Sequence, residues 1–199
     1  GSFRLRKEIL DKPITEEKMI QVYNWCDKYN LRASSFTMIA IPTEDKESLQ
    51  ETIRMTAKLK PYLIRLTFCY PFENTILWDY VMKHDLLDKT KYMEQSGYFE
   101  QSPLKWDKDF EQTLMVYRYL FPWIVNTVVL SADKAIKYKE AIQLFKNANF
   151  MDKEILDMII SLDKDMSALT GDLEHYCYFD RNLAYYNCKN KKMAIKIKA

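Results

Sequence analysis

Two short apolar segments joined by one amphipathic stretch constrain the fold of this chain more than any other feature. The first covers residues 35–41 and the second residues 62–69, and each runs into a loop marked by proline, at Pro42 and Pro71. Between them, apolar residues recur at helical spacing. A strand–helix–strand order with short connections predicts two parallel strands and a right-handed crossover. Ligands of such folds bind beyond the carboxyl ends of the strands, so we expect the functional site there.

Composition excludes several classes of function. The chain has 199 residues, of which 48% are hydrophobic, so it can bury a sizeable core. Its formal net charge of +2 argues against a dedicated nucleic-acid-binding protein. Three glycines are too few for a P-loop or a Rossmann glycine fingerprint. The most apolar stretch, residues 119–130, is too short to span a bilayer and contains Pro122 and Asn126.

The cysteines and histidines indicate the expected compartment and argue against a resident metal. Four cysteines are scattered along the chain without a CxxC pair, which favours a reducing, cytoplasmic setting. With two histidines, a self-contained zinc or haem site is not expected. Cys69 ends the second strand with no base beside it in the sequence, so we interpret it as a buried spectator. The basic run at residues 189–198 is interpreted as a solvated tail.

Periodicity and capping residues predict the remaining elements. Thr15 is a good helix N-cap, and either Thr43 or Asp45 can cap the helix between the strands. Residues 88–107 are typical of a loop, and residues 193–197 alternate as a strand would. We expect helices at residues 3–10, 16–29, 45–59, 76–87, 110–130 (kinked at Pro122), 132–147 and 151–161. Two strands do not make a stable sheet, so further strands come either from elsewhere in the chain or from a larger barrel.

Four ordered segments carry a family resemblance: residues 1–7 (GSFRLRK), 10–15 (LDKPIT), 36–44 (FTMIAIPTE) and 70–75 (YPFENT). In order and spacing they resemble the second half of a radical S-adenosylmethionine (radical SAM) domain. The nearest group is the one in which a cobalamin-binding domain precedes the barrel. The resemblance covers roughly residues 1–85.

This chain departs from the family patterns at their glycines. The strand motif of the family usually reads Met-Ile-Gly-Ile-Pro-Gly-Glu-Thr, and here Ala40 and Thr43 replace the two glycines while Asp45 replaces the final threonine. The later loop usually reads Tyr-Pro-Xaa-Xaa-Gly-Thr, and here Asn74 stands at the glycine. Asparagine also tolerates positive φ, so this last replacement still allows the left-handed backbone conformation that glycine adopts easily.

The resemblance implies an α/β fold and a radical reaction. Residues 1–87 would be the C-terminal portion of a partial (β/α) barrel with parallel strands, and residues 88–199 a mainly helical extension. In the family a 4Fe–4S cluster reduces S-adenosylmethionine to a 5′-deoxyadenosyl radical, or cobalamin carries a methyl group. The cluster is held by a CxxxCxxC loop that this sequence lacks. We therefore expect the cluster ligands to lie outside this chain, which would be an enzyme fragment that is inactive alone.

The resemblance also implies one wall of the S-adenosylmethionine pocket. Ile39, Ile41, Pro42 and Glu44 would form that wall, with Ile41 packing on the adenine and Glu44 as a polar partner. An alternative stays open for Glu44, because an acid at this position also stabilises the start of the following helix.

Four further positions follow from the family comparison, and a fifth, Arg65, from its place in an apolar strand. Phe68 and Tyr70, at the end of the second strand, would add adenine contacts, or serve only as core and rim residues. Ser2 and Arg4 would contact the ribose and the methionine carboxylate, unless Arg4 lies on a solvated helix face. Arg65, within the second strand, is either a structural ion pair or a substrate contact.

Two other functions remain alternatives. The chain is a non-catalytic interaction module that uses the apolar helix at residues 114–130, or it is an unrelated barrel enzyme that uses Glu44 and Glu73. For the radical enzyme, the expected partners are the missing N-terminal half of the barrel and a small-molecule or lipid-like substrate, without nucleic acid or a transmembrane segment. Because such a fragment leaves a sheet edge open, we expect the isolated chain to self-associate.

Overall fold

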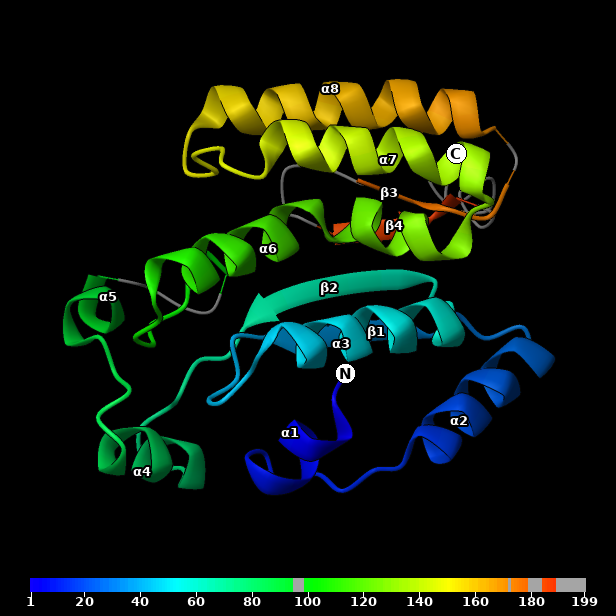
Figure 1. Cartoon of the computed structure of the whole chain (residues 1–199). Coiled ribbons are helices and arrows are strands. Elements are labelled where there is room, and N and C mark those ends of the chain that lie inside the picture. Colours follow the sequence, from blue (N-terminus) through cyan, green and yellow to red (C-terminus); the bar gives the residue numbers. More distant parts are fainter. Residues whose placement is uncertain (95–98, 172, 179–183, 189–199) are drawn as a thin grey trace, which may run out of the picture.

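The centre of the fold is a pair of parallel strands joined by a helix, in a mixed α/β chain (Figure 1). A computed structural model describes residues 1–94, 99–171, 173–178 and 184–188. Strand β1 (Ser34–Ile39) pairs with β2 (Leu63–Phe68) in register from Ser34 opposite Leu63 to Ile39 opposite Phe68. Helix α3 (Lys46–Leu59) makes the crossover and ends with Lys60 in the left-handed conformation, just before Pro61. The predicted strand–helix–strand unit is confirmed.

The C-terminal part of the chain returns to the same sheet. Strands β3 (Tyr176–Tyr178) and β4 (Ala184–Asn187) pair antiparallel with each other, and β4 pairs antiparallel with β2. The strand order is β1-β2-β4-β3, so the sheet is mixed: the parallel pair expected within residues 1–87 is extended by antiparallel strands from the part expected to be mainly helical. The side chain of Asn126 holds the tail here, since it bonds both backbone groups of Tyr176, at 2.7 and 2.8 Å. The strand expected at residues 193–197 lies outside the described residues.

The helices largely follow the predicted positions. Thr15 and Asp45 both accept a hydrogen bond from the backbone three residues on, as N-caps do. One helix occupies the stretch expected to be a loop, because Asp88 accepts from the backbone N–H of Lys91 and starts a turn. The remaining bounds are α1 (Phe3–Glu8), α2 (Glu16–Lys28), α4 (Ile76–Lys83), α5 (Lys89–Glu94), α6 (Lys108–Val129), α7 (Ala132–Phe145) and α8 (Lys153–Thr170). Helix α4 is shorter and α8 longer than predicted.

One face of the sheet is buried against helices. Ile39, Ile64, Leu66 and Phe68 belong to a core cluster that also takes residues from α3, α6, α7 and α8. In Figure 1, α7 and α8 lie above α6, which in turn lies above β2. Helix α6 is kinked at Leu120, two residues before Pro122, as predicted. The division at residue 87 stays a prediction, although this core draws residues from both sides of it.

Because α6 is largely buried, residues 114–130 do not form the exposed interaction surface that the alternative of an interaction module requires. Ten of its residues are buried, among them Leu114, Tyr117, Phe121 and Trp123. These side chains form the core instead of a free docking face.

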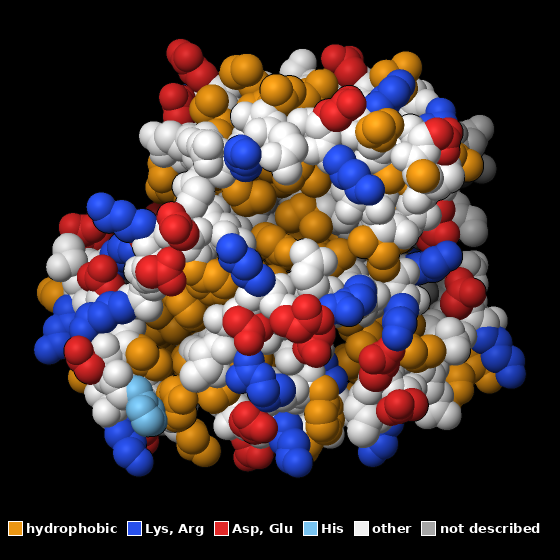
Figure 2. All heavy atoms as spheres, in the orientation of Figure 1, with side chains coloured by type: hydrophobic (Ala, Val, Ile, Leu, Met, Phe, Trp, Pro, Cys, Tyr) orange, Lys and Arg blue, Asp and Glu red, His pale blue; other side chains and the backbone are white. Residues whose placement is uncertain are grey.

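In Figure 2 the viewer-facing side of α3 carries charges of both signs, which fits a solvated helix surface. Among the described residues, no helix is long and apolar enough to cross a membrane.

The opposite face of β1 and β2 is open. Phe36 is 78% exposed, and its neighbour across the strands, Arg65, is also exposed. Met38 and Thr67 lie between them and the carboxyl ends, half-buried. Within the described residues Arg65 makes no ion pair, so the structural ion pair that the sequence left open for it is not found there.

Candidate functional site

The carboxyl ends of β1 and β2 meet, and the loops that follow them form the candidate site. The backbone N–H of Cys69 donates to the carbonyl of Ile39 at 2.7 Å, which extends the strand pairing by one step. Leu5 of α1 packs against Ile41 and Cys69, so the N-terminal helix is fastened to both strand ends. We call residues 1–6, 40–45 and 69–75 together the carboxyl-edge site.

The first loop is a tight turn whose backbone requires left-handed residues. The N–H of Glu44 donates to the carbonyl of Ile41 at 2.8 Å, which closes a four-residue turn with Pro42 at its second position. Thr43, at the third position, has φ of 66°, as a type II turn requires. Ala40, just before the turn, has φ of 58°. Non-glycine residues adopt this conformation rarely and at a cost of roughly 1–2 kcal/mol each.

Glu44 lies inside this turn as a buried carboxyl group. It is 5% exposed, and its Oε2 accepts from the backbone N–H of Ile41 at 3.2 Å. Its other oxygen, Oε1, is buried without a hydrogen-bond partner among the described residues. Burial raises the pKa of Glu44 from its ordinary value of 4.5 to about 8, against the backbone N–H groups of Ile41 and Ala40, which lower it. Glu44 is therefore a largely protonated acid at neutral pH with one unsatisfied oxygen.

Arg4 holds the outside of the same turn. Its guanidinium donates to Thr43 Oγ1 at 3.2 Å, to the Thr43 carbonyl at 3.1 Å and to Ser48 Oγ at 3.2 Å. It also forms an ion pair with Asp45 at 3.5 Å. With its donors committed in this way, Arg4 fixes the position of the turn. The sequence did not predict this network, although the matched charges of Arg4 and Asp45 were its one visible signal.

The residues before α1 approach α3 closely. A Cβ atom added at Gly1 would lie 1.8 Å from Thr52 Oγ1, so glycine is the residue that fits here. Ser2 is buried at 5% exposure, and its carbonyl accepts from the N–H of Arg6 at 3.1 Å. Ser2 is therefore the N-cap residue of α1, although its side chain makes no capping hydrogen bond.

The second loop carries an aromatic stack. The ring of Tyr70 stacks on Tyr92 of α5 with centroids 5.0 Å apart and contacts Phe72 at the same centroid distance. Asn74 has φ of 63°, and Thr75 then caps α4 by accepting from the N–H of Trp78 at 3.1 Å. Tyr92 was missed by sequence reasoning because it lies in the stretch expected to be a loop.

The structure brings together some of the predicted residues and not others. Arg4, Ile41, Pro42 and Glu44 lie in or against the first turn, whereas Ser2 is the buried residue before α1, and Tyr70 borders the second loop.

One predicted wall residue, one predicted adenine contact and a cysteine belong to the interior instead. Ile39 and Phe68 point into the core under α3 and α6, so only their backbone groups face the site. The Cys69 thiol is buried, and burial followed by the nearby Glu44 raises its pKa to about 12. This agrees with a chemically inert spectator.

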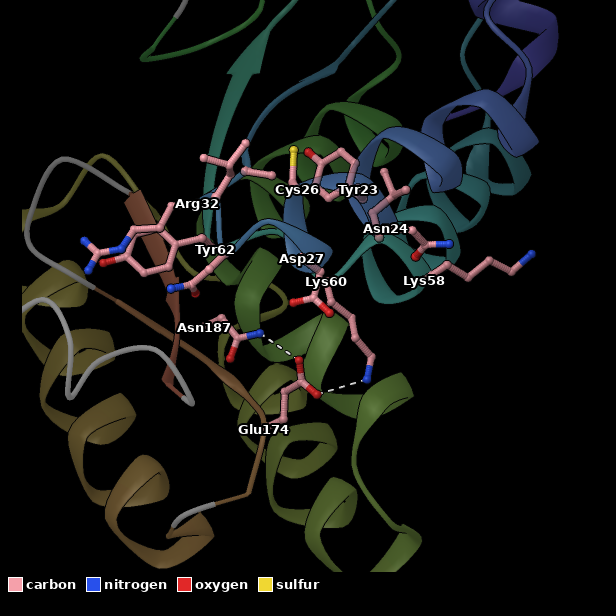
Figure 3. A pocket seen from close by; sticks show the side chains of 14 residues that line it. Tyr23, Asn24, Cys26, Asp27, Arg32, Lys58, Lys60, Tyr62, Glu174 and Asn187 are labelled. Atoms are coloured by element: carbon pink, nitrogen blue, oxygen red, sulfur yellow. Dashed lines mark hydrogen bonds and ion pairs between the residues drawn. The ribbon is translucent and has the colours of Figure 1, made fainter.

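A separate cavity lies at the amino ends of the same strands (Figure 3). It has a volume of about 300 Å³ and is lined by residues of α2, the two strand entrances and the C-terminal part, including Tyr23, Arg32, Tyr62 and Glu174. Two of its charges pair with each other: Lys60 lies 3.0 Å from Glu174, which also accepts a hydrogen bond from Asn187 at 2.9 Å. Arg32 lies over the Tyr62 ring at 5.0 Å. Such mutual pairing is typical of a structural site, so we assign function to the carboxyl edge.

The described residues fit one of the cofactors that the resemblance implies better than the other. In the described part of the chain no three His, Cys, Asp or Glu side chains gather as metal ligands. A 4Fe–4S cluster therefore does not fit these residues. The carboxyl edge does offer an apolar side chain at Ile41, an unsatisfied oxygen at Glu44 Oε1 and the Tyr70 ring, which suit a nucleoside with polar and planar parts.

Comparison with known proteins gives one partial similarity. No protein-family model matches the chain. Over 80 residues, 40% of this chain, it is 30% identical to an uncharacterised methyltransferase from Pyrococcus horikoshii. The matched segment spans 17% of the length of that protein. The chain is thus similar in part to a methyltransferase much longer than the matched segment.

Proposed function

We propose that this chain furnishes one wall of an S-adenosylmethionine site, at its carboxyl edge, within a larger methyl-transferring or radical SAM enzyme. The observation that carries the proposal is the backbone of the two loops. Ala40, Thr43 and Asn74 all have φ near +60°. They stand at the three positions where the resembled motifs have glycine, the residue that adopts this conformation most easily.

Two further observations support the same site. The partial similarity to a methyltransferase agrees with a methyl-donor ligand. The close approach of Gly1 to Thr52 matches the Gly-Ser of the family motif, since a side chain at this position would collide with α3. Gly1 and the left-handed residues come from separate parts of the sequence, and the strands bring them to the same site.

Each of these residues would have a separate role in binding S-adenosylmethionine. Ile41 packs against the adenine, and Glu44 Oε1, which has no partner in the described structure, bonds a polar group of the ligand. Tyr70 provides a planar surface across the site. Arg4 is a positioning residue that holds the turn through Thr43, in place of the carboxylate contact expected for it.

In the finer form of the proposal, the enzyme is a radical SAM protein of the cobalamin-associated type. Its cluster ligands, and a cobalamin where one is used, belong to parts of the enzyme beyond this chain, and the N-terminal half of the barrel pairs with the outer edge of β1. The small-molecule or lipid-like substrate then lies over the open sheet face, where Phe36 and Arg65 are exposed. S-adenosylmethionine supplies either a 5′-deoxyadenosyl radical or a methyl group.

The first experiment is a titration of the isotope-labelled chain with S-adenosylmethionine, followed by NMR. We expect shifts of the backbone amides of residues 40–45 and 70–75. Glu44→Ala, which removes the whole carboxyl group, should weaken binding by about tenfold, the value of one hydrogen bond in a buried site. Glu174→Ala, in the cavity at the opposite edge, is the matched control and should bind normally. Shifts confined to that cavity would contradict the assignment.

A second experiment separates radical chemistry from direct methyl transfer. The whole enzyme, purified without oxygen and supplied with a reductant, should release 5′-deoxyadenosine from S-adenosylmethionine if the radical form is correct. The coding DNA upstream of Gly1 should then encode a CxxxCxxC loop in frame. If the enzyme releases only S-adenosylhomocysteine and no such loop is encoded, the proposal of a methyl-donor site would stand, but the proposal of a radical reaction would be wrong.

A further inference from the structure

Two cysteines that are distant from the carboxyl edge converge at the end of the β3–β4 pair. Cys177 lies in β3, and Cys188 directly follows β4. Their sulfur atoms are 2.7 Å apart. The backbone N–H of Cys188 donates to the carbonyl of His175 at 2.7 Å, so the sheet pairing itself holds the two residues together.

The surroundings of the pair favour a reactive thiol at Cys188. Ser167 Oγ of α8 lies 3.8 Å from Cys188 Sγ and 2.7 Å from His175 Nε2. His175 Nδ1 lies 2.7 Å from the carbonyl of Leu173, which that nitrogen meets as a donor. Hydrogen bonding from Cys177, opposed by burial and assisted by His175 and Ser167, lowers the pKa of Cys188 to about 5. A thiolate, the nucleophilic form of cysteine, is therefore favoured at this position.

Accessibility distinguishes the two sulfurs. Cys177 is 1% exposed, whereas Cys188 is only partly buried. An oxidant from solution therefore meets Cys188 first, with Cys177 directly behind it. Among the residues that the structure describes, the other two cysteines have no cysteine beside them: Cys26 lies on α2, and Cys69 is buried at the carboxyl edge with its pKa raised.

We propose that Cys177 and Cys188 form a site of thiol oxidation that closes into an intrachain disulfide, with a hydroperoxide as the oxidant. The Cys188 thiolate attacks the peroxide oxygen, the O–O bond breaks, and a sulfenic acid forms as hydroxide leaves. The Cys177 thiol then attacks the Cys188 sulfur, the S–OH bond breaks, and water leaves. Two thiols and one hydrogen peroxide give one disulfide and two waters. A disulfide bond of about 2.05 Å requires the sulfurs to approach by only about 0.7 Å from their 2.7 Å separation.

The reaction has a consequence for the sheet. The new bond ties the residue after β4 to the middle of β3, and β4 is the strand that joins β3 to β2. Oxidation would therefore fasten the C-terminal part of the sheet without touching the carboxyl-edge site. The inference is independent of the proposed function, because it uses none of the residues of that site.

The experiment is peptide mapping after oxidation of the intact chain. The chain is treated with hydrogen peroxide, alkylated and digested with trypsin, which places Cys177 in the peptide 165–181 and Cys188 in the peptide 182–189. We expect these two peptides to appear linked and to separate on reduction, while Cys26 and Cys69 remain alkylated.

Variants make the test specific. Cys177→Ser should convert the reaction into a stable sulfenic or sulfinic acid on Cys188, and Cys188→Ser should leave Cys177 reduced. Cys26→Ser is the control and should still give the linked peptides. Full alkylation of both Cys177 and Cys188 in the peroxide-treated wild-type chain would overturn the proposal, as would oxidation of Cys188 to the sulfinic acid with Cys177 still alkylated. Because these readouts on the wild-type chain need no variant, the proposal can fail even where a serine substitution destabilises the fold.

Discussion

The buried carboxyl group of Glu44 makes the stability of this protein depend on pH in a defined direction. Its pKa is about 8 in the folded chain, against 4.5 as the ordinary value, because burial penalises the charged form. The folded state therefore holds the proton more tightly than the unfolded state. The stability that follows is fully present below about pH 4.5 and is lost as the pH rises to about 8.

The size of the effect follows from this difference in pKa. Each pKa unit corresponds to about 1.4 kcal/mol, so the wild-type chain should lose about 3 kcal/mol of unfolding free energy between pH 4.5 and pH 7 through Glu44 alone. Glu44→Gln keeps the acceptor for the N–H of Ile41 but cannot ionise. We expect the variant to match the wild type near pH 5 and to exceed its stability by about 4 kcal/mol at pH 8.

Urea unfolding followed by fluorescence of the four tryptophans, at several values between pH 5 and pH 8, measures this difference. Asp163, whose pKa burial raises to about 6, also makes stability depend on pH, but it is present in both chains and cancels in the comparison. Two stability curves that stay parallel over the whole range would refute the reasoning, because they would mean that Glu44 ionises like an exposed acid.

Three further predictions concern other parts of the chain. Asn126→Ala should lower the unfolding free energy by about 2–4 kcal/mol, because it leaves both backbone groups of Tyr176 buried without partners. The control Asn24→Ala, on the exposed side of α2, should change the unfolding free energy little. Chemical denaturation measures both. Oxidation of the Cys177–Cys188 pair should raise the unfolding free energy by about 3 kcal/mol, which a reductant reverses in the same assay. Phe36→Ser should reduce the self-association expected of the isolated chain, since β1 is an edge strand of the sheet and Phe36 is 78% exposed. A monodisperse wild-type monomer in light scattering would contradict this expectation.

Local signals in the sequence predicted the first half of the fold well. Thr15 and Asp45 act through hydrogen bonds that span three residues, so their capping roles are visible in the sequence alone. The stop at Pro61 and the kink at Pro122 are local in the same sense. These cues are enough to place the strand–helix–strand unit and its carboxyl ends.

The rest depends on contacts between distant residues. The side chain of Asn126 bonds Tyr176, fifty positions away, and no periodicity indicates that the tail returns to the sheet. The pairing of β2 with β4 joins segments more than a hundred residues apart. The meeting of Cys177 with Cys188 follows from that return, so cysteines that look scattered in the sequence become neighbours only in the folded chain.

The left-handed residues of the two loops have a consequence for motion. A glycine at these positions would leave the unfolded and free loops many more conformations, whereas Ala40, Thr43 and Asn74 restrict them. The loops therefore have less conformational entropy to lose when something binds between them. Arg4 also bonds across the first turn, so binding at the proposed site should depend on the shape of the ligand more than on closure of the protein around it.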